Sequence, residues 1–486
     1  MVVTTPPPPV ARTLEEANEI IARQHWEIVA LREENAALKE RVAALEARVA
    51  ELVALLAQNS TNSSRPPSTD PPWSKPKRKP PEPPSGRKPG GQPGHEGHAR
   101  EAVPPERVTG TNDVYPERCE CGYEFEDHEG CEDAYVHQVI DLPPVQAQVT
   151  NWRVWNQKCP RCGRRTRAEL PVGVPEDGKG ARLKAAVALL TAKYHVSRLG
   201  LVAVLHDLFD VDLSAGAVQK TCERVSAAVA PTVEAIRQEV ALAPAAHADE
   251  TGWRQQRKRS WLWTATTPLA AYFVLAKSRG RDALALLLPV DYAGFLHVDR
   301  WRPYEVYDAR HRQICHSHLR RDFQGVIDRG GDAKHFGEWL LAESNRLFHI
   351  WHAFDRGEIT RVEMIRAMRP VQMRWGRALA RAADSADRKM RALARDLIRQ
   401  WPAIWTFVYV DGVEPSNNDA ERALRPAVLW RKGSFGTQSD AGSAFVARML
   451  TVIETARRRG VHVLDWLEQA CRAANLGIAP PPLLSG

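Results

Sequence analysis

The stretch HADETGW (247–253) follows a run of small apolar residues and places two acids, Asp249 and Glu250, side by side. Two segments with alternating apolar residues come next, SWLWTATT (260–267) and AYFVLAKS (271–278), with turn signals between them. The three segments are therefore predicted to be neighbouring strands. Because side chains alternate between the two faces of a strand, only one of the two acids can face a given site.

The segments that follow extend this pattern. RDALALLL (281–288) is predicted to be a helix, GFLHVDRWRPY (294–304) a strand that ends in Asp299, and QICHSHLRRDFQGVI (313–327) a strand that runs into a helix. Three strands followed by helix and strand units in this order are typical of a ribonuclease-H-like fold. In such a sheet the first and fourth strands are neighbours, so Asp249 and Asp299 are expected to lie close together.

Paired carboxylates of this kind suit magnesium chemistry on phosphodiesters, in which two ions lie about 3.5–4 Å apart. A third acid is then expected from a helix, and EPSNNDAERALRP (414–426) offers Asp419 and Glu421. These two cannot readily face one ion, because helical positions two apart do not share a face. Arg422 and Arg425 flank Glu421 and are predicted to contact phosphate oxygens.

The N-terminal segment 14–58 carries a heptad repeat that predicts a parallel dimeric coiled coil. β-Branched residues at position a with leucine at position d favour parallel dimers, and a buried asparagine at a fixes their register. The d residues are Leu31, Leu38, Leu45 and Leu52, and the a residues are Ile28, Asn35, Val42 and Val49. The pairs that would face each other across the dimer are opposite in charge: Glu27–Arg32, Glu34–Lys39 and Arg41–Glu46. The alternative is one long amphipathic helix packed on its own chain.

Residues 59–104 are rich in Pro, Ser and Gly and cannot bury enough apolar surface to fold alone. Between Arg65 and Arg100 there are eight Lys or Arg residues against three Asp or Glu residues. A basic arm that contacts DNA phosphates is one interpretation, and a solubilising linker is the other. The sequence KPKRK favours DNA, and its predicted contacts are Lys75, Lys77, Arg78 and Lys79.

Two cysteine pairs, CEC and CPRC, are separated by segments with strand-like alternation and resemble a zinc ribbon over residues 105–172. Zinc prefers four ligands in a tetrahedron, and Cys-x-x-Cys lets two thiolates meet one ion. The first pair is one residue shorter than the usual knuckle, and cysteines without metal are the alternative. The predicted structural Zn²⁺ ligands are Cys119, Cys121, Cys159 and Cys162.

Two further regions are predicted to be helical. Residues 173–243 have an apolar period near 3.6 with a break at VDLSAG (211–216), where Ser214 is the expected N-cap. A DNA-binding helix-turn-helix or an ordinary helical pair would give this pattern. Residues 332–400 are rich in Arg and Trp and predict a helical insertion between the fifth strand and the helix with the third acid. That insertion would hold DNA or a second protomer, or serve as a structural cap.

The segment CHSH places Cys315, His316 and His318 at the predicted strand-to-helix edge. No second pair with metal-binding spacing accompanies them, and the residues around them are apolar. They are therefore interpreted as supporting residues beside the candidate site.

The motifs HADETGW, HVDRW, CHSHLRRDF and SNNDAERALRP, in this order, resemble those of transposases of insertion-sequence family sixty-six (IS66). The likeness extends to the linker, the CPRCG knuckle and the C-terminal part. It implies that Asp249, Asp299 and Glu421 form a DDE triad that holds two Mg²⁺ ions, with Mn²⁺ as a substitute. It also implies DNA end cleavage and strand transfer at terminal inverted repeats, and two accessory proteins. The CEC pair and the long interval from Asp299 to Glu421 depart from the family pattern.

The length and net charge of the chain indicate several domains and a polyanionic partner. A chain of 486 residues is too long for one hydrophobic core, and its net charge of +8 suits a polyanionic partner. It lacks a signal-peptide pattern and a membrane-spanning run, so a cytoplasmic, nucleoid-associated protein without a membrane partner is expected. The alternatives to a transposase are a nuclease of the same fold that does not join DNA, and a non-enzymatic zinc-containing DNA-binding regulator.

The fold class predicted from these segments is a multidomain α+β protein. The predicted parts are a disordered start (1–13), a coiled coil (14–58), a linker (59–104), a zinc module (105–172), a helical region (173–243), the first part of a ribonuclease-H-like core (244–331), a helical insertion (332–400), the Glu-bearing part of the core (401–460), and a C-terminal helix and tail (461–486).

Overall fold

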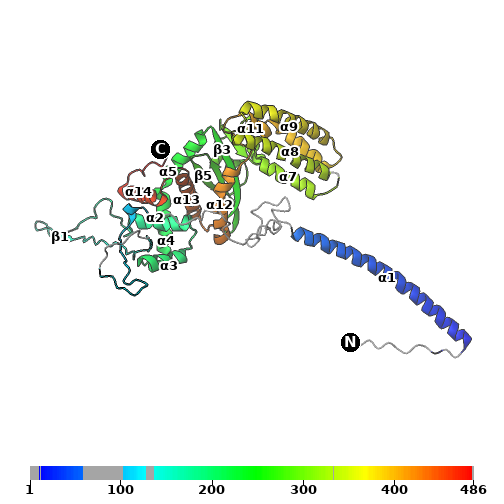
Figure 1. The fold of residues 1–486 in the computed structure, drawn as a ribbon, viewed down its shortest axis with the longest axis horizontal. Coiled ribbons are helices and arrows are strands. Elements are labelled where there is room, and N and C mark those ends of the chain that lie inside the picture. The colour runs from blue at the N-terminus through cyan, green and yellow to red at the C-terminus, as the bar shows by residue number, and fades with distance from the viewer. Residues whose placement is uncertain (1–9, 11–12, 58–101, 127–135, 332, 484–486) are drawn as a thin grey trace.

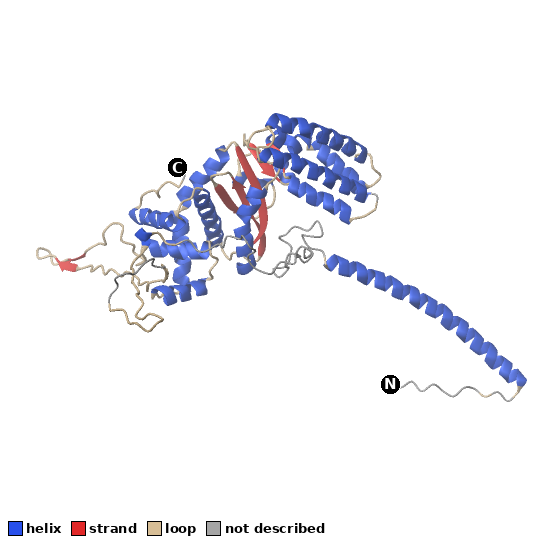
Figure 2. Ribbon diagram, in the orientation of Figure 1, coloured by secondary structure: helices blue, strands red, loops and turns tan. Residues whose placement is uncertain are grey.

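The computed structural model describes residues 10, 13–57, 102–126, 136–331 and 333–483 of the chain. Within them the protein is a mixed α+β structure in which one sheet lies between two groups of helices (Figures 1 and 2). The predicted α+β class is confirmed at this level. None of the helices in these ranges has the length and apolar character needed to cross a bilayer.

The central sheet has five strands in the order β5-β4-β3-β6-β7. Strands β3, β4 and β5 pair antiparallel, whereas β6 and β7 run parallel to β3. The strands are β3 (Ala245–Gln255), β4 (Lys258–Thr266), β5 (Ala271–Ala276), β6 (Phe295–Val298) and β7 (Arg312–Ile314). Helix α6 (Arg281–Leu287) joins β5 to β6, and two short 3₁₀ turns, η3 (Arg302–Val306) and η4 (Ala309–His311), lead into β7. The strand that carries Asp249 and the strand that precedes Asp299 are thus neighbours, as expected.

Within the described residues, helices pack along both edges of this sheet, which limits pairing of these edges with another chain. At the β5 edge, the backbone N–H groups of Ala271 and Phe273 donate to the hydroxyls of Thr455 and Thr451 on α13 (Asp440–Arg458), at 3.1 and 3.0 Å. At the β7 edge, the backbone N–H of Phe407 donates to the side-chain oxygen of Gln313 at 2.8 Å. Hydrogen bonds that involve side chains therefore join a helix to each edge of the sheet.

The helices divide between two hydrophobic cores. The first core joins most of the sheet to the helices α2 (Ala181–Ala192), α3 (Arg198–Phe209), α4 (Ala215–Ala228), α5 (Ala230–Leu242), α6, α12 (Asn418–Ser434), α13 and α14 (Val463–Leu476). The second core joins α7 (His316–Asp328), α8 (Ala333–Asp355), α9 (Arg361–Ala382), α10 (Arg388–Arg399) and α11 (Trp401–Tyr409). The helical insertion thus has a core of its own and extends to Tyr409, beyond the predicted limit at residue 400. The predicted N-cap Ser214 accepts a hydrogen bond from the N–H of Ala217 at 3.2 Å.

The N-terminal elements match the predictions only in part. Helix α1 (Leu14–Leu56) covers the predicted coiled-coil segment. Among the described residues near the cysteines, the strands are β1 (Asn156–Lys158) and β2 (Arg165–Arg167), a hairpin that flanks CPRC, and the turn η2 (Pro105–Arg107) precedes CEC. Strand-like alternation was expected between the two cysteine pairs up to residue 158. In its described part a strand forms over Asn156–Lys158, whereas residues 136–155 form none and their apolar side chains are largely exposed. The predicted disordered start lies almost wholly outside the described residues.

The loop after α12 is hydrogen-bonded to the end of β3, and these bonds hold the end of α12 at the sheet. The N–H of Thr437 donates to the Arg254 carbonyl at 2.9 Å, and the N–H of Gln256 donates to the Thr437 carbonyl at 2.8 Å. Gly436, which directly precedes Thr437, has a φ of +104°, and a Cβ added there would collide with the Arg254 carbonyl oxygen. Both the backbone angle and the close approach therefore require glycine.

Gly436→Ala is accordingly expected to destabilise the protein by about 2 kcal/mol, since a strained backbone angle and a clash must both be relieved. The matched control is Gly433→Ala near the end of α12, where an added Cβ meets nothing within 4 Å. That change is expected to be neutral or to stabilise by less than about 1 kcal/mol. Thermal unfolding of both variants measures the difference. Equal melting temperatures would contradict the need for glycine at position 436.

Candidate active site

Asp249 lies within β3, and Asp299 directly follows the neighbouring parallel strand β6. In the β3–β6 pairing His247 is opposite His297, and the same register continued by two residues sets Asp249 opposite Asp299. The imidazoles of His247 and His297 stack with ring centroids 3.9 Å apart, which shows that both side chains occupy the same face. Because side chains alternate along a strand, Asp249 lies on that face as well.

The carboxyl groups of Asp249 and Asp299 lie among other acids. Burial, followed by the neighbouring charges of Glu250 and Asp299, raises the pKa of Asp249 well above its usual range. Burial and then the Glu250 charge raise the pKa of Asp299 to about 7, against a smaller opposing effect of Arg279. Glu421 adds a smaller repulsion on Asp249. A cluster of acids such as this is suited to a cation.

Glu250 occupies the opposite face of β3 and has partners of its own. Its side chain is buried, with an ion pair to Arg279 at 2.6 Å and a hydrogen bond from the Tyr304 hydroxyl at 2.8 Å. Arg279 in turn lies over the Trp301 ring at 4.1 Å. Glu250 is therefore paired with an arginine, and Asp249 is the acid of HADETGW that faces the candidate site.

The segment before α12 is held to the sheet by a buried network centred on Asn417. Its side-chain amide donates to the Ala248 carbonyl at 2.7 Å, and its side-chain oxygen lies 3.2 Å from His247 Nδ1. The Asn417 backbone N–H donates to Cys315 Sγ at 3.2 Å. The backbone N–H of Glu414 donates to His297 Nε2 at 3.0 Å. These bonds bring α12 to Asp249 despite the long insertion between them.

Asp419 and Glu421 on α12 point to different neighbours, as expected for positions two apart. Asp419 accepts a hydrogen bond from the Thr266 hydroxyl at 2.6 Å and an ion pair from Arg458 at 2.9 Å. These partners outweigh burial and lower the pKa of Asp419. Asp419 therefore has a structural role on the sheet, and Glu421 is the acid that α12 offers to the site.

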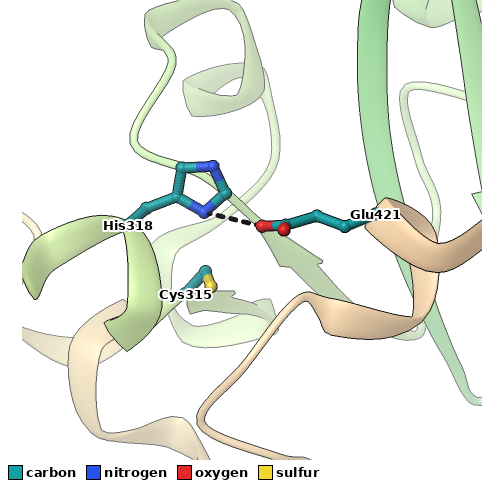
Figure 3. Close-up of side chains that lie close together, drawn as sticks. All are labelled: Cys315, His318 and Glu421. Atoms are coloured by element: carbon teal, nitrogen blue, oxygen red, sulfur yellow. Dashed lines mark ion pairs between the residues drawn. The ribbon is translucent and has the colours of Figure 1, made fainter. Parts of the chain in front are cut away.

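Glu421 faces the start of α7. Its Oε1 lies 3.4 Å from His318 Nδ1 and 3.3 Å from Arg321 Nη2, and Figure 3 shows its side chain pointing toward His318 with Cys315 beside them. Burial, followed by the Arg321 charge, lowers the pKa of His318 to about 3. The imidazole is therefore neutral near pH 7, and the charge partner of Glu421 is Arg321.

The predicted phosphate contacts Arg422 and Arg425 lie exposed on α12 next to Glu421. Arg422 has one weak partner, Asp419, at 3.7 Å. Their positions leave both guanidinium groups accessible to a polyanion. The predicted DNA contacts Lys75, Lys77, Arg78 and Lys79 lie outside the described residues.

The four predicted zinc ligands form two pairs. Hydrogen bonds from the Tyr123 backbone and then from Cys119 lower the pKa of Cys121, and those from the backbone around Cys162 and then from its thiol lower the pKa of Cys159. The paired thiols therefore contact each other within CEC and within CPRC. Within the described ranges, however, the one group of three or more metal-ligating atoms that converge within 4.8 Å is Cys315, His318 and Glu421. The two cysteine pairs are thus not gathered around one point.

Several residues that build the site carried no clear signal in the sequence. Arg321 and Asn417 lie far from Asp249 along the chain, and only the motifs CHSHLRRDF and SNNDAER, read together, would have suggested that they meet. His247 and His297 could have been found from their equal spacing to Asp249 and Asp299, two residues before each acid. The equal spacing is what the parallel register requires.

Comparison with known proteins agrees with this arrangement. The family model described as "Transposase IS66 family" matches residues 179–444, and that of a family of unknown function (DUF6444) matches residues 6–101. Two relatives in Sinorhizobium fredii, the uncharacterized proteins y4qI and y4hP, are each 25% identical to this chain. The alignments cover 43% and 53% of this chain, and 43% and 52% of the relatives. The chain thus spans about half the length of the curated relatives it matches. Since the transposase model covers more than half of the 486 residues and includes Asp249, Asp299 and Glu421, the chain belongs to the IS66 family of transposases.

Proposed function

We propose that this protein cleaves DNA at the ends of an insertion sequence and joins those ends to target DNA in a Mg²⁺-dependent reaction. The observation that carries the proposal is the proximity of Asp249, within β3, to Asp299, directly after the parallel strand β6, with Glu421 close enough to repel Asp249. The strand order of the sheet also supports a ribonuclease-H-like core.

The side chains present fit hard divalent cations. Asp249, Asp299 and Glu421 offer carboxylate oxygens, the ligands that Mg²⁺ prefers, and Mn²⁺ accepts the same set. Burial and neighbouring carboxylates raise the pKa values of Asp249 and Asp299, and a bound cation would offset this repulsion. We infer that these three residues would hold the ions. Bound Mg²⁺ would supply charge neutralisation at the phosphodiester and activation of the attacking oxygen.

The proposed reaction has two in-line displacements. Water attacks the phosphodiester at the element end and the 3′-oxygen leaves; the resulting 3′-hydroxyl then attacks a phosphodiester of the target and displaces its 3′-oxygen. The protein itself would hold Asp249 on β3 and Asp299 directly after β6, and would orient the DNA. Arg422 and Arg425, exposed beside Glu421, are proposed to contact phosphate oxygens.

Other parts of the chain are proposed to recognise the terminal inverted repeats. The basic arm with KPKRK would contact phosphates, and the cysteine module and the helical region 173–243 would add further contacts. A structural Zn²⁺ is proposed at the cysteine pairs from the Cys-x-x-Cys spacing of CPRC. Accessory proteins of the same element are proposed as partners, and the nucleoid is proposed as the location.

Joining two DNA ends requires two catalytic subunits, and helix α1 is proposed to pair them as a parallel coiled coil. The exposed a and d residues of α1 support this, since they remain uncovered in the single chain; Leu31 is 56% exposed and Leu38 is 49% exposed. A second copy would bury this seam and place Asn35 opposite its own counterpart.

Leu38→Ala is expected to raise the dissociation constant of the dimer by at least about tenfold, because it removes a buried d residue from each helix. Glu40→Ala, at an outward position of the same helix, is the control and is expected to leave the dimer unchanged. Sedimentation equilibrium measures both dissociation constants. Equal values for Leu38→Ala and the unaltered chain would exclude α1 as the dimer contact.

The experiment that tests the proposed function is a strand-transfer assay with the purified chain, Mg²⁺ and labelled element ends. Joined products are expected in addition to cleaved ends. Cleaved ends without joined products would indicate a nuclease, and binding without cleavage would indicate a DNA-binding regulator. Either outcome would overturn the proposal.

A further inference from the structure

Three different types of metal ligand converge where the two hydrophobic cores meet. Cys315 immediately precedes α7, His318 lies in the first turn of α7, and Glu421 lies in the first turn of α12. Their thiol, imidazole and carboxylate ligand atoms all lie within 4.8 Å of one another. Figure 3 shows His318 on α7 and Glu421 on α12 pointing toward each other, with Cys315 beside them.

The spacing of the His318 and Glu421 ligand atoms fits a tetrahedral ion, and each of these atoms lies within 4.8 Å of Cys315 Sγ. Two ligands at about 2.0–2.1 Å from tetrahedral zinc lie about 3.3–3.4 Å apart, and a zinc thiolate at about 2.3 Å lies about 3.6 Å from such a ligand. His318 Nδ1 and Glu421 Oε1 are 3.4 Å apart. A cation could therefore enter with small side-chain adjustments, and three protein ligands would leave a fourth position open.

Two local features bear on cation binding at this point. His318 Nδ1 is buried and makes no hydrogen bond, although it faces a carboxylate. The Cys315 sulfur accepts the Asn417 N–H at 3.2 Å, although burial raises the pKa of this thiol to about 11, so a bound cation would have to displace its proton. Arg321 contacts the Glu421 oxygen that faces His318, so a bound cation would share that carboxylate with Arg321 or use its second oxygen.

We propose that Cys315, His318 and Glu421 bind a divalent cation of the Zn²⁺ class. A mixed sulfur, nitrogen and oxygen set suits zinc or cobalt, whereas Mg²⁺ prefers oxygen ligands alone. The site shares Glu421 with the proposed Mg²⁺ ligands, so the two cations would compete for one carboxylate. This inference concerns binding in the absence of DNA and is independent of strand transfer.

The test is Co²⁺ titration of the full-length, metal-stripped chain, in which thiolate coordination gives a charge-transfer absorption band. The background carries serine at the four positions 119, 121, 159 and 162, which removes the cysteines of the other proposed metal site. One bound cobalt with a thiolate band is expected. Cys315→Ser should abolish the band, and His318→Ala or Glu421→Gln should weaken cobalt binding at least about tenfold. Cys471→Ser removes another buried cysteine and should leave the band unchanged.

Absence of a thiolate band in this background, or its persistence in Cys315→Ser, would overturn the proposal. If circular dichroism shows that Cys315→Ser is unfolded, His318→Ala decides the matter, since an unchanged cobalt affinity would also overturn it. No DNA is present in the titration. A failed strand-transfer assay and a failed cobalt titration therefore refute different statements.

Discussion

Asp249→Asn is expected to abolish Mg²⁺-dependent cleavage of element ends while leaving binding of those ends largely intact. The amide keeps the size of the carboxylate but removes its charge at the centre of the acidic cluster with Asp299 and Glu421. Loss of about 4 kcal/mol of transition-state stabilisation corresponds to about a thousandfold lower rate. Cleavage of labelled ends measures the rate, and a gel-shift titration measures binding.

The matched control for this substitution is Asp291→Asn, which removes a carboxylate from an exposed loop. It is expected to change neither cleavage nor end binding. A cleavage rate in Asp249→Asn close to that of the control would refute the proposed triad. Loss of end binding together with cleavage would instead show that Asp249 acts on the fold or on DNA contact, which would also contradict its proposed role.

The sheet and the choice of Asp249 over Glu250 could be predicted because they follow from local rules. Alternation along β3 allows one of the two acids to face the site, and the position of Asp299 at the end of another predicted strand selects which. The structure adds the reason that Glu250 is tolerated where it lies. Its buried charge is paired with Arg279 and bonded by Tyr304, two residues that the sequence pattern did not connect to it.

Predictions failed where alternation in the sequence had no partner in space. The residues between the two cysteine pairs alternate like strands, yet a strand is stable only when its hydrogen bonds are shared with a neighbour. The heptads of α1 predict a helix, and the pairing of that helix with a second chain stays a prediction. The helical insertion continues past residue 400, because α11 packs in the second core.

The position of Glu421 depends on contacts that no local pattern predicts, and Asn417 is their centre. Asn417→Ala would remove the amide that donates to the Ala248 carbonyl and the oxygen beside His247 Nδ1, which leaves two buried polar groups without these partners. At about 1–3 kcal/mol for each such group, a destabilisation of about 4 kcal/mol is expected. Cleavage of element ends should fall as well, since α12 would lose its attachment to β3 next to Asp249.

Asn418→Ala, the same substitution one residue along the chain, provides the control because Asn418 is exposed. It is expected to change the free energy of unfolding by less than about 0.5 kcal/mol, as is usual for surface positions. Thermal unfolding compares the two variants, and end cleavage below the unfolding temperature tests the position of Glu421. If Asn417→Ala melted like Asn418→Ala and cleaved at the same rate, the network would not be what brings α12 to the sheet. The insertion between β7 and α12 would then have to place Glu421 through its own packing.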